Sequence, residues 1–302
     1  MDHEVSLLLD CAHCSGLLEH QVQVELSDRY SDLNRFDINQ IWTERLSKEP
    51  WLFNGAKFRL HSFCLPKHHP GSVLTLRLGL TCYKDYLGTN WSGEVAELRR
   101  HGQEEFGDPL ALFAQPLGVG AVLCTCDGQV VFIRRSQKVA EAGGLLDIPG
   151  GHPEPKVTLV MMQQRPDAVV LELFSSICAE IRDEVNIPLS SLGPPVLMGI
   201  ALNHTSAGRP SVEFYISCSL SSDEVRTLYW KGGAEANEST DVVFLSTTVS
   251  SALKSEVPLW SELCPSAKGA MLLYQVVKPG DANVLKYPSF RSTLPPMSHF
   301  FL

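Results

Sequence analysis

The sequence predicts an α/β (α+β) fold, a mixed β-sheet sandwiched between helices, with an N-terminal accessory α/β subdomain. Segments with the apolar periodicity of helices alternate along the chain with segments whose apolar residues alternate as in strands. Helices packed on a mixed sheet are the usual architecture for such an order. The chain has 302 residues, of which 44% are hydrophobic and 20% charged, a composition typical of globular proteins that bury their own core.

The N-terminal part is predicted to form a helix followed by a hairpin. Apolar residues recur at helical spacing in residues 36–46, and Pro50 marks the end of that pattern. Residues 58–80 are apolar at alternate positions around a turn at 66–71, as in a β-hairpin. The Pro and Gly residues of 115–120 indicate a domain boundary. The predicted division is 1–115 for the accessory subdomain, 116–278 for the main domain and 279–302 for a C-terminal tail.

The main domain is predicted to begin with a second hairpin. Asp127-Gly128 is the signal of a tight primed turn, and it separates two apolar runs. The chain then breaks at Asp147-Ile-Pro-Gly-Gly before a long helical pattern begins near Ala168. The remaining expected elements are strands at 196–201 and 212–219 and a closing helix at 266–277.

Charge and cysteine content exclude several classes of protein. Lys and Arg total 25 against 34 Asp and Glu, a formal charge of −9, so the average field repels nucleic acid. No apolar run approaches the roughly 18 residues of a membrane-spanning helix, and the acidic N-terminus lacks the basic segment of a secretory signal. Nine cysteines without a framework spacing favour a reducing compartment. We therefore expect a cytoplasmic or nuclear protein that binds neither nucleic acid nor membrane.

Acidic residues on the long predicted helix are the main chemical signal. At ~100° per residue, four acids fall within roughly 120° of one another: Glu172, Glu180, Asp183 and Glu184. Glu180 and Glu184 repel each other at i,i+4 spacing, and a bound cation would remove that conflict. Carboxylates on a rigid helix are hard oxygen ligands suited to Mg²⁺. From the helix alone, a solvated acidic face remains the alternative interpretation.

The turn and the end of this helix resemble the box motif of the Nudix hydrolases, Gly-x5-Glu-x7-Arg-Glu-U-x-Glu-Glu-x-Gly-U, where U is aliphatic. The two segments are Asp147-Ile-Pro-Gly-Gly-His-Pro-Glu154 and Ala179-Glu-Ile-Arg-Asp-Glu-Val-Asn-Ile187. The matching positions are Gly151, Glu180, Ile181, Asp183, Glu184 and Ile187.

Three features depart from that motif. An insertion at 153–166 separates the glycines from the helix, and Ala179 stands where the family has Arg. We expect that Arg182 or another cation takes the part of that Arg, or that the metal site is weaker. Asn186 replaces the Gly at the helix end, and Asn is the next-best residue for a left-handed cap.

The resemblance implies a Nudix fold and a Mg²⁺ cofactor. Segments 51–53, 57–62, 78–91, 147–155 and 263–270 are similar to the nucleotide-sugar pyrophosphatases of the family. That similarity implies Mg²⁺-dependent hydrolysis of the diphosphate of UDP-glucose and UDP-galactose to UMP and glucose or galactose 1-phosphate. Two alternatives stay open: a catalytically weak Nudix-fold module that binds a nucleotide or a protein, and a hydrolase of another nucleoside diphosphate derivative, such as ADP-ribose or coenzyme A.

These arguments assign roles to named residues. The predicted catalytic residues are Glu180, Asp183 and Glu184, and the predicted metal ligands are Glu180, Glu184 and Gly151. Glu154 and Glu172 are expected to assist, and Glu213, Glu235 and Glu238 are candidate late-arriving bases. Lys57 and Arg59 are predicted to pair with the diphosphate. The predicted nucleotide-sugar pocket adds Tyr83, Asp85, Tyr86, Thr89, Asn90, Asn203, Thr205 and Ser206. The alternative is that the tyrosines are core rings and Asn90 a turn residue.

Overall fold

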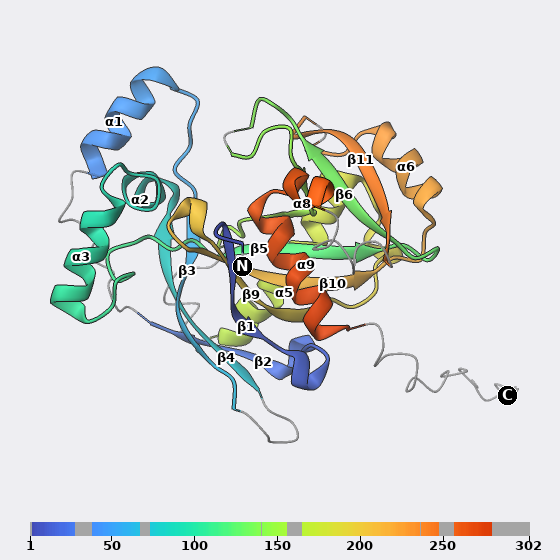
Figure 1. Ribbon diagram of the computed structural model, residues 1–302, viewed down its shortest axis with the longest axis horizontal. Helices are drawn as coiled ribbons and strands as arrows, with labels where there is room; N and C mark the ends of the chain where they lie inside the picture. The colour runs from blue at the N-terminus through green and yellow to red at the C-terminus, as the bar shows by residue number, and fades with distance from the viewer. Residues whose placement is uncertain are drawn as a thin grey trace, which may run out of the picture.

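The computed structural model describes residues 2–27, 38–66, 73–139, 141–155, 165–235, 237–247 and 257–279. It confirms the predicted α/β class. An eight-stranded mixed sheet lies between helix α5 (Pro166–Val185) and helix α9 (Pro265–Val277), as Figure 1 shows. A three-stranded sheet and helices α1, α2 and α3 form a second part beside it.

The large sheet has the strand order β1-β9-β10-β5-β6-β11, and two short strands, β7 and β8, pair with β6 and β5. Strands β10 and β5 run parallel, whereas β1–β9, β9–β10, β5–β6 and β6–β11 are antiparallel. The hairpin and the two later strands predicted from sequence are confirmed. The strands are β1 (Val5–Asp10), β5 (Gly118–Cys124), β6 (Gln129–Arg135), β7 (Leu146–Asp147), β8 (Gly150–Gly151), β9 (Val196–Asn203), β10 (Arg209–Ser217) and β11 (Ser239–Ser246).

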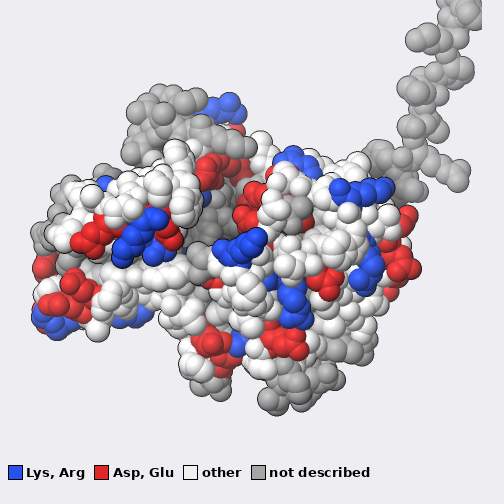
Figure 2. Space-filling view, turned by 90° about the horizontal axis from the view of Figure 1, so that it is seen from above, with Lys and Arg blue, Asp and Glu red and all other residues white. Residues whose placement is uncertain are grey.

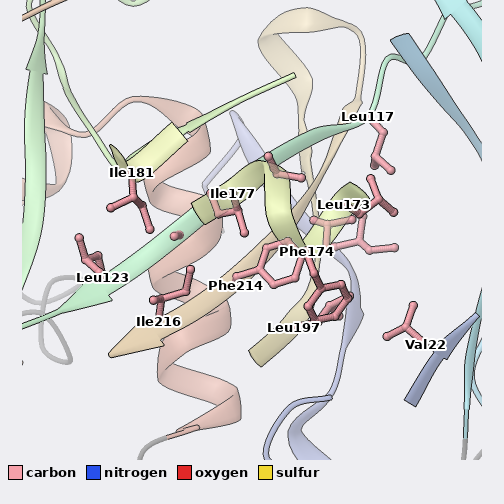
Figure 3. Packing of buried hydrophobic residues seen from close by; sticks show 14 of the residues in the cluster. Val22, Leu117, Leu123, Leu173, Phe174, Ile177, Ile181, Leu197, Phe214 and Ile216 are labelled. Carbon is pink, nitrogen blue, oxygen red and sulfur yellow. The ribbon is translucent and has the colours of Figure 1, made fainter. Parts of the chain in front are cut away.

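Helices α5 and α9 bury opposite faces of this sheet. Ala121 and Leu123 of β5 belong to the core under α5, while Val122, between them, belongs to the core under α9, as the period of two in a strand requires. Under α5, the Phe174 ring meets Phe214 of β10 edge to face, with centroids 5.0 Å apart, and Figure 3 shows this packing. These contacts fix α5, and with it the acids near its C-terminal end.

Helix α5 begins and ends where its sequence predicts. Pro166 occupies the first turn, where its missing N–H costs no hydrogen bond. Asn186 adopts the left-handed conformation (φ 63°) and its N–H donates to the Arg182 carbonyl at 2.9 Å, which confirms the predicted cap. The prediction that four acids share one exposed face is wrong for one residue. Glu184 is 4% exposed and lies on the buried side of the helix beside Ile181.

The N-terminal part contains the predicted helix and hairpin. Helix α1 (Ile38–Lys48) confirms the helix within the described residues; positions 36 and 37 and the turn at 67–71 lie outside them. Strands β3 (Ala56–Cys64) and β4 (Leu74–Cys82) form the antiparallel hairpin, and β2 (Val22–Leu26) adds to β4 in parallel. Helices α2 (Tyr83–Gly88) and α3 (Val95–Phe106) follow the hairpin.

One strand crosses the predicted division at residue 115. Strand β1 pairs with β9 and so forms an edge of the large sheet, although it belongs to the N-terminal segment. Helix α6 (Ser222–Lys231) and helix α8 (Val257–Glu262) complete the elements used below. Most of the insertion, 156–164, and the tail from 280 lie outside the described residues. Among the helices that the structure describes, none combines the length and apolar character needed to span a bilayer.

Candidate active site

A cavity of about 1030 Å³ lies where the large sheet meets the N-terminal part. Strands β5 and β6 pair at Cys124 and Val130 and then separate, and the chain at 146–151 runs between them, with β7 on β6 and β8 on β5. The cavity lies against this split. Figure 2, seen from above, shows a hollow between the two parts of the molecule with Asp and Glu side chains on both sides of it.

The two glycines of β8 bring backbone close to α5. The Gly150 N–H donates to Glu184 Oε2 at 2.9 Å. A Cβ on Gly151 would lie 2.5 Å from Cδ and 2.8 Å from Oε2 of Glu180, closer than side chains approach one another. Glycine at 151 therefore leaves room for the Glu180 carboxylate at the edge of the cavity.

Glu180 and Glu184 are carboxyl groups with perturbed titration. Burial, reinforced by Glu235, Asp183 and Glu238, raises the pKa of Glu180 to about 7, and Lys57 opposes the shift. Burial also raises the pKa of Glu184 well above its ordinary value; the Gly150 N–H lowers it, and Glu180 and other nearby acids raise it. The negative charges thus repel one another in a partly desolvated site.

Two further acids come from the loop between α6 and β11. The Glu235 N–H donates to the Asp183 carbonyl at 2.9 Å, and the Ser136 N–H donates to the Glu238 carbonyl at 2.8 Å. The first bond docks the loop on the end of α5 and the second docks it on the residue after β6, and both Glu235 and Glu238 line the cavity. Burial raises the pKa of Glu235, as do Glu238 and Asp183. The sequence named these two acids as candidates without placing them.

A divalent cation fits this set of donors. Nearby acids raise the pKa of Glu180, Glu184 and Glu235, and Glu238 is among those acids for all three, which is the repulsion that a cation would relieve. Within the described ranges, no three His, Cys, Asp or Glu side chains are close enough to form a complete metal site. Mg²⁺ commonly takes one or two carboxylates and fills its other positions with water and substrate phosphate.

Three of the cations that line the same cavity are each paired with an acid. Lys57 Nζ lies 2.8 Å from Glu154 Oε1 and donates to the His152 carbonyl at 3.1 Å. Arg135 Nη1 donates to Asp147 Oδ2 at 3.0 Å. The Arg209 guanidinium binds both oxygens of Glu141, each at 2.9 Å. The cavity therefore holds cations for phosphate beside the acids for a metal.

Aromatic rings form the wall on the N-terminal side. Tyr83 and Tyr86 of α2 are stacked at an interplanar angle of 28°, and the Trp91 ring meets Tyr86 edge to face. All three rings line the cavity. The structure thus brings together these predicted pocket residues: Lys57, Tyr83, Tyr86, Asn203, Thr205 and Ser206.

Four predicted pocket residues do not line this cavity. Thr89 and Asn90 are buried and hold the backbone: Thr89 Oγ1 accepts from the Ala114 N–H at 3.0 Å, and Asn90 Oδ1 accepts from the Gln115 N–H at 3.2 Å. Gln115 has a left-handed φ of 43°, so these bonds stabilise a strained turn. The interpretation of Asn90 as a turn-stabilising residue is the one that the geometry favours.

The other two residues outside the cavity lining are Arg59 and Asp85. Arg59 is 3% exposed, and its Nη2 donates to the Ala111 carbonyl at 2.9 Å inside a smaller pocket of about 250 Å³. The Asp85 carbonyl accepts from Thr89 Oγ1 at 2.7 Å within helix α2 and the residue after it. Neither Arg59 nor Asp85 is among the residues that line the large cavity, which corrects the expectation that both belong to the substrate pocket.

Asp183 and Arg182 pair with each other rather than with the cavity. Two guanidinium nitrogens of Arg182 donate to the Asp183 carboxylate at 2.7 Å each, on the outer side of α5. Arg182 is exposed and paired with Asp183, so the geometry favours another cation over Arg182 as the substitute for the Arg missing at Ala179. A cation does act on Glu184, but it is Arg135 of β6, whose pKa Glu184 helps to raise.

Other cavity residues were missed or left unplaced by the sequence. Arg135, Glu141 and Trp91 carried no spacing signal, because they come from β6, the following loop and the chain after α2.

Glu213 was named only as a candidate base. It is fully buried on β10, and its Oε2 has no hydrogen-bond partner among the described residues. Burial, with a smaller contribution from Asp147, raises its pKa to about 8 against a hydrogen bond from Ser211.

Comparison with known proteins gives relatives over nearly the whole chain. No family model matches it. Uridine diphosphate glucose pyrophosphatase NUDT22 of Mus musculus is 50% identical over 302 residues, which cover 96% of this chain and 97% of the relative. The protein of the same name in Homo sapiens is 52% identical over 289 residues, 92% of this chain and 94% of the relative. Nudix hydrolase 9 of Arabidopsis thaliana is 34% identical over 273 residues, 83% of this chain and 86% of the relative.

Proposed function

This chain belongs to the Nudix hydrolase family, and from that premise we propose that it hydrolyses the diphosphate of UDP-glucose and UDP-galactose. The products are UMP and glucose or galactose 1-phosphate. The chain is a hydrolase. The proposed substrate is based on the names of two relatives that match it over nearly their whole length, both uridine diphosphate glucose pyrophosphatases. The observation that carries the site assignment is the contact of Gly150 and Gly151 with Glu184 and Glu180 at one cavity.

Mg²⁺ is the proposed cofactor, held by Glu180 and Glu184 with the backbone at Gly151. When bound, it supplies charge neutralisation for the diphosphate and activates water for hydrolysis. Glu184 is fixed for this role by the Gly150 N–H, and the Glu180 carboxylate has its place because residue 151 has no side chain. Glu235 or Glu238 takes the attacking water's proton, since both line the cavity beside Glu180. Asp183 acts through its carbonyl, which positions Glu235.

The nucleotide sugar is proposed to lie between the two parts of the molecule. Lys57 from β3 faces the glycine segment through its bond to the His152 carbonyl, so it is placed to pair with a phosphate there. Tyr83 supplies a flat surface for the uracil ring, and Asn203 and Thr205 supply hydrogen-bonding groups. On this proposal, residues 1–115 contribute to substrate recognition, residues 116–278 together with strand β1 form the hydrolase domain, and 279–302 are a tail.

The proposed compartment is the cytoplasm or the nucleus. All nine cysteines are free thiols, which suits a reducing environment. Fluorescence microscopy of the tagged full-length chain tests this, and retention in the secretory pathway would contradict it.

The test of the activity is Glu184→Gln. The variant keeps a side chain that can accept from the Gly150 N–H but loses the charge that holds the metal. We expect kcat for UDP-glucose to fall at least about 100-fold, measured as UMP released in the presence of Mg²⁺. Glu97→Gln, on the exposed side of α3, is the control. Chelation by EDTA should stop the wild-type reaction, and Mg²⁺ should restore it.

Two results would contradict this assignment. A wild-type rate in the folded Glu184→Gln variant would show that the metal is held elsewhere. Wild-type enzyme that cleaves ADP-ribose or coenzyme A but not UDP-glucose would keep the site and overturn the substrate.

A further inference from the structure

One ion pair in the cavity joins three distant parts of the chain. The Arg209 guanidinium, at the start of β10, binds both carboxylate oxygens of Glu141, and its Nη1 lies 3.0 Å from the Tyr86 hydroxyl. Tyr86 donates to Glu141 Oε1 at 2.7 Å. The Arg209 and Glu141 side chains are 14% and 25% exposed, so the pair is well shielded from solvent yet lines the cavity.

This guanidinium stands next to the glycine segment. Ser211 follows Arg209 by two residues, so both point to the same face of β10. Ser211 pairs with Gly118 of β5, and a Cβ on Gly118 would lie 3.2 Å from Ser211 Cβ and 3.5 Å from the Gly151 carbonyl oxygen. Arg209 is therefore about one pleat away from the backbone beside which the metal and the reacting phosphates are proposed to lie.

Carboxylate and phosphate bind the arginine fork in the same way. Both present two oxygens that accept parallel N–H bonds from one guanidinium. A carboxylate from the protein itself thus occupies a position that fits a phosphate oxygen pair. We propose that Glu141 is a stand-in anion: the diphosphate of the substrate displaces it from Arg209, and Arg209 then binds the diphosphate. This inference rests on the proposed function.

The geometry allows the exchange with a small movement. The Glu141 carbonyl accepts from Arg135 Nε at 3.1 Å, so the backbone of this loop is anchored while the side chain can rotate away. Tyr86 keeps its hydroxyl on Arg209 and its ring under the guanidinium, whose centre is 5.3 Å from the ring centroid. Arg209 therefore stays in position when Glu141 leaves.

The test is Glu141→Gln, which keeps the size of the side chain and removes its charge. Because the competing anion is gone, KM for UDP-glucose should fall about fivefold, with kcat changed less than twofold. Inorganic pyrophosphate, titrated calorimetrically without Mg²⁺, should bind tighter by the same factor. Arg209→Lys loses the bidentate fork, so it should raise KM, and in that background Glu141→Gln should have little further effect.

The matched control is Glu104→Gln on α3. Arg100 Nη1 binds both oxygens of Glu104, at 3.0 and 2.8 Å, on an exposed helix face outside the cavity lining. Removing that charge should leave KM unchanged. Glu141→Asp, which keeps the charge on a shorter side chain, is the second variant if Glu141→Gln is poorly folded, and it should lower KM by a smaller factor.

The outcomes separate this inference from the proposed function. A folded Glu141→Gln variant with a raised or unchanged KM, or with weaker or unchanged pyrophosphate binding, overturns the stand-in role and makes Glu141 a structural or substrate-binding group. Wild-type enzyme that fails to cleave UDP-glucose overturns the function instead. The pyrophosphate titration then still tests the stand-in role, because it does not depend on turnover. If neither the wild type nor the Glu141→Gln variant binds pyrophosphate, the stand-in role is refuted.

Discussion

Replacing Gly151 by Ala tests the close approach of β8 to helix α5. The added Cβ would overlap Glu180 Oε1 and lie 2.5 Å from its Cδ, whereas real contacts of this kind are at least ~3.4 Å. The carboxylate therefore has to retreat by about 1 Å, and a misplacement of that size costs ~100-fold in rate. Gly151 does not have a positive φ, so Ala itself fits the backbone, and stability should change by less than about 1 kcal/mol.

Two other glycines provide the comparison. On Gly150 the Cβ would overlap the Val119 carbonyl oxygen and lie 3.0 Å from Gly120 Cα. Backbone cannot move aside as a side chain does, so Gly150→Ala should cost about 1–3 kcal/mol of unfolding free energy. A Cβ on Gly93 meets nothing within 4 Å, so Gly93→Ala is the control for both variants.

The assays are UMP release from UDP-glucose at increasing Mg²⁺ concentrations and urea unfolding of the same preparations. The expected pattern is a folded Gly151→Ala variant with kcat lowered ~100-fold or with a raised Mg²⁺ requirement. Gly151→Ala with kcat and Mg²⁺ requirement within threefold of wild type would refute the reasoning, and so would a loss of stability equal to that of Gly150→Ala.

Three further predictions concern buried groups. In the folded protein Glu213 keeps its proton up to about pH 8, whereas in the unfolded chain it loses the proton near its ordinary pKa. The free energy of unfolding should therefore fall by about 1.4 kcal/mol for each pH unit between roughly pH 5 and pH 8. Glu213→Gln should flatten that slope in urea titrations, and an unchanged slope would be contrary evidence. Asn90→Ala removes the acceptor of the Gln115 N–H and the donor to the Ser206 carbonyl, which should cost about 1–3 kcal/mol with KM changed less than twofold; a tenfold KM shift at unchanged stability would place Asn90 in the pocket. Phe174→Ala should cost about 3–5 kcal/mol by losing its contact with Phe214, and a loss below 1 kcal/mol in urea unfolding would refute the packing.

Local sequence patterns predicted the main helices and strands well, because residues close together in the sequence determine these elements. The apolar spacing of α5 and its Asn186 cap both appear as predicted. The same reasoning failed for Glu184, since an acid at the margin of an apolar stripe is buried or exposed according to what packs there. Here the Gly150 N–H supplies the partner that makes its burial possible.

Polar residues in turns were harder to interpret. Thr89 and Asn90 follow two aromatic residues of a predicted pocket, yet they hold the strained backbone at Gln115. A polar side chain near an aromatic one carries no local mark of whether it binds a ligand or a main-chain group. Tyr83 and Tyr86 beside them do line the cavity.

The sequence alone determined the α/β class, the amphipathic acid-bearing helix and its glycine turn, because helical periodicity and turn chemistry act over a few residues. Tertiary structure alone decided which distant groups meet: Tyr86, Glu141 and Arg209 around one guanidinium, and Glu235 on the end of α5. These contacts depend on strand order and on the docking of loops. Spacing along the chain does not encode either, since each contact is fixed by the packing of the whole sheet.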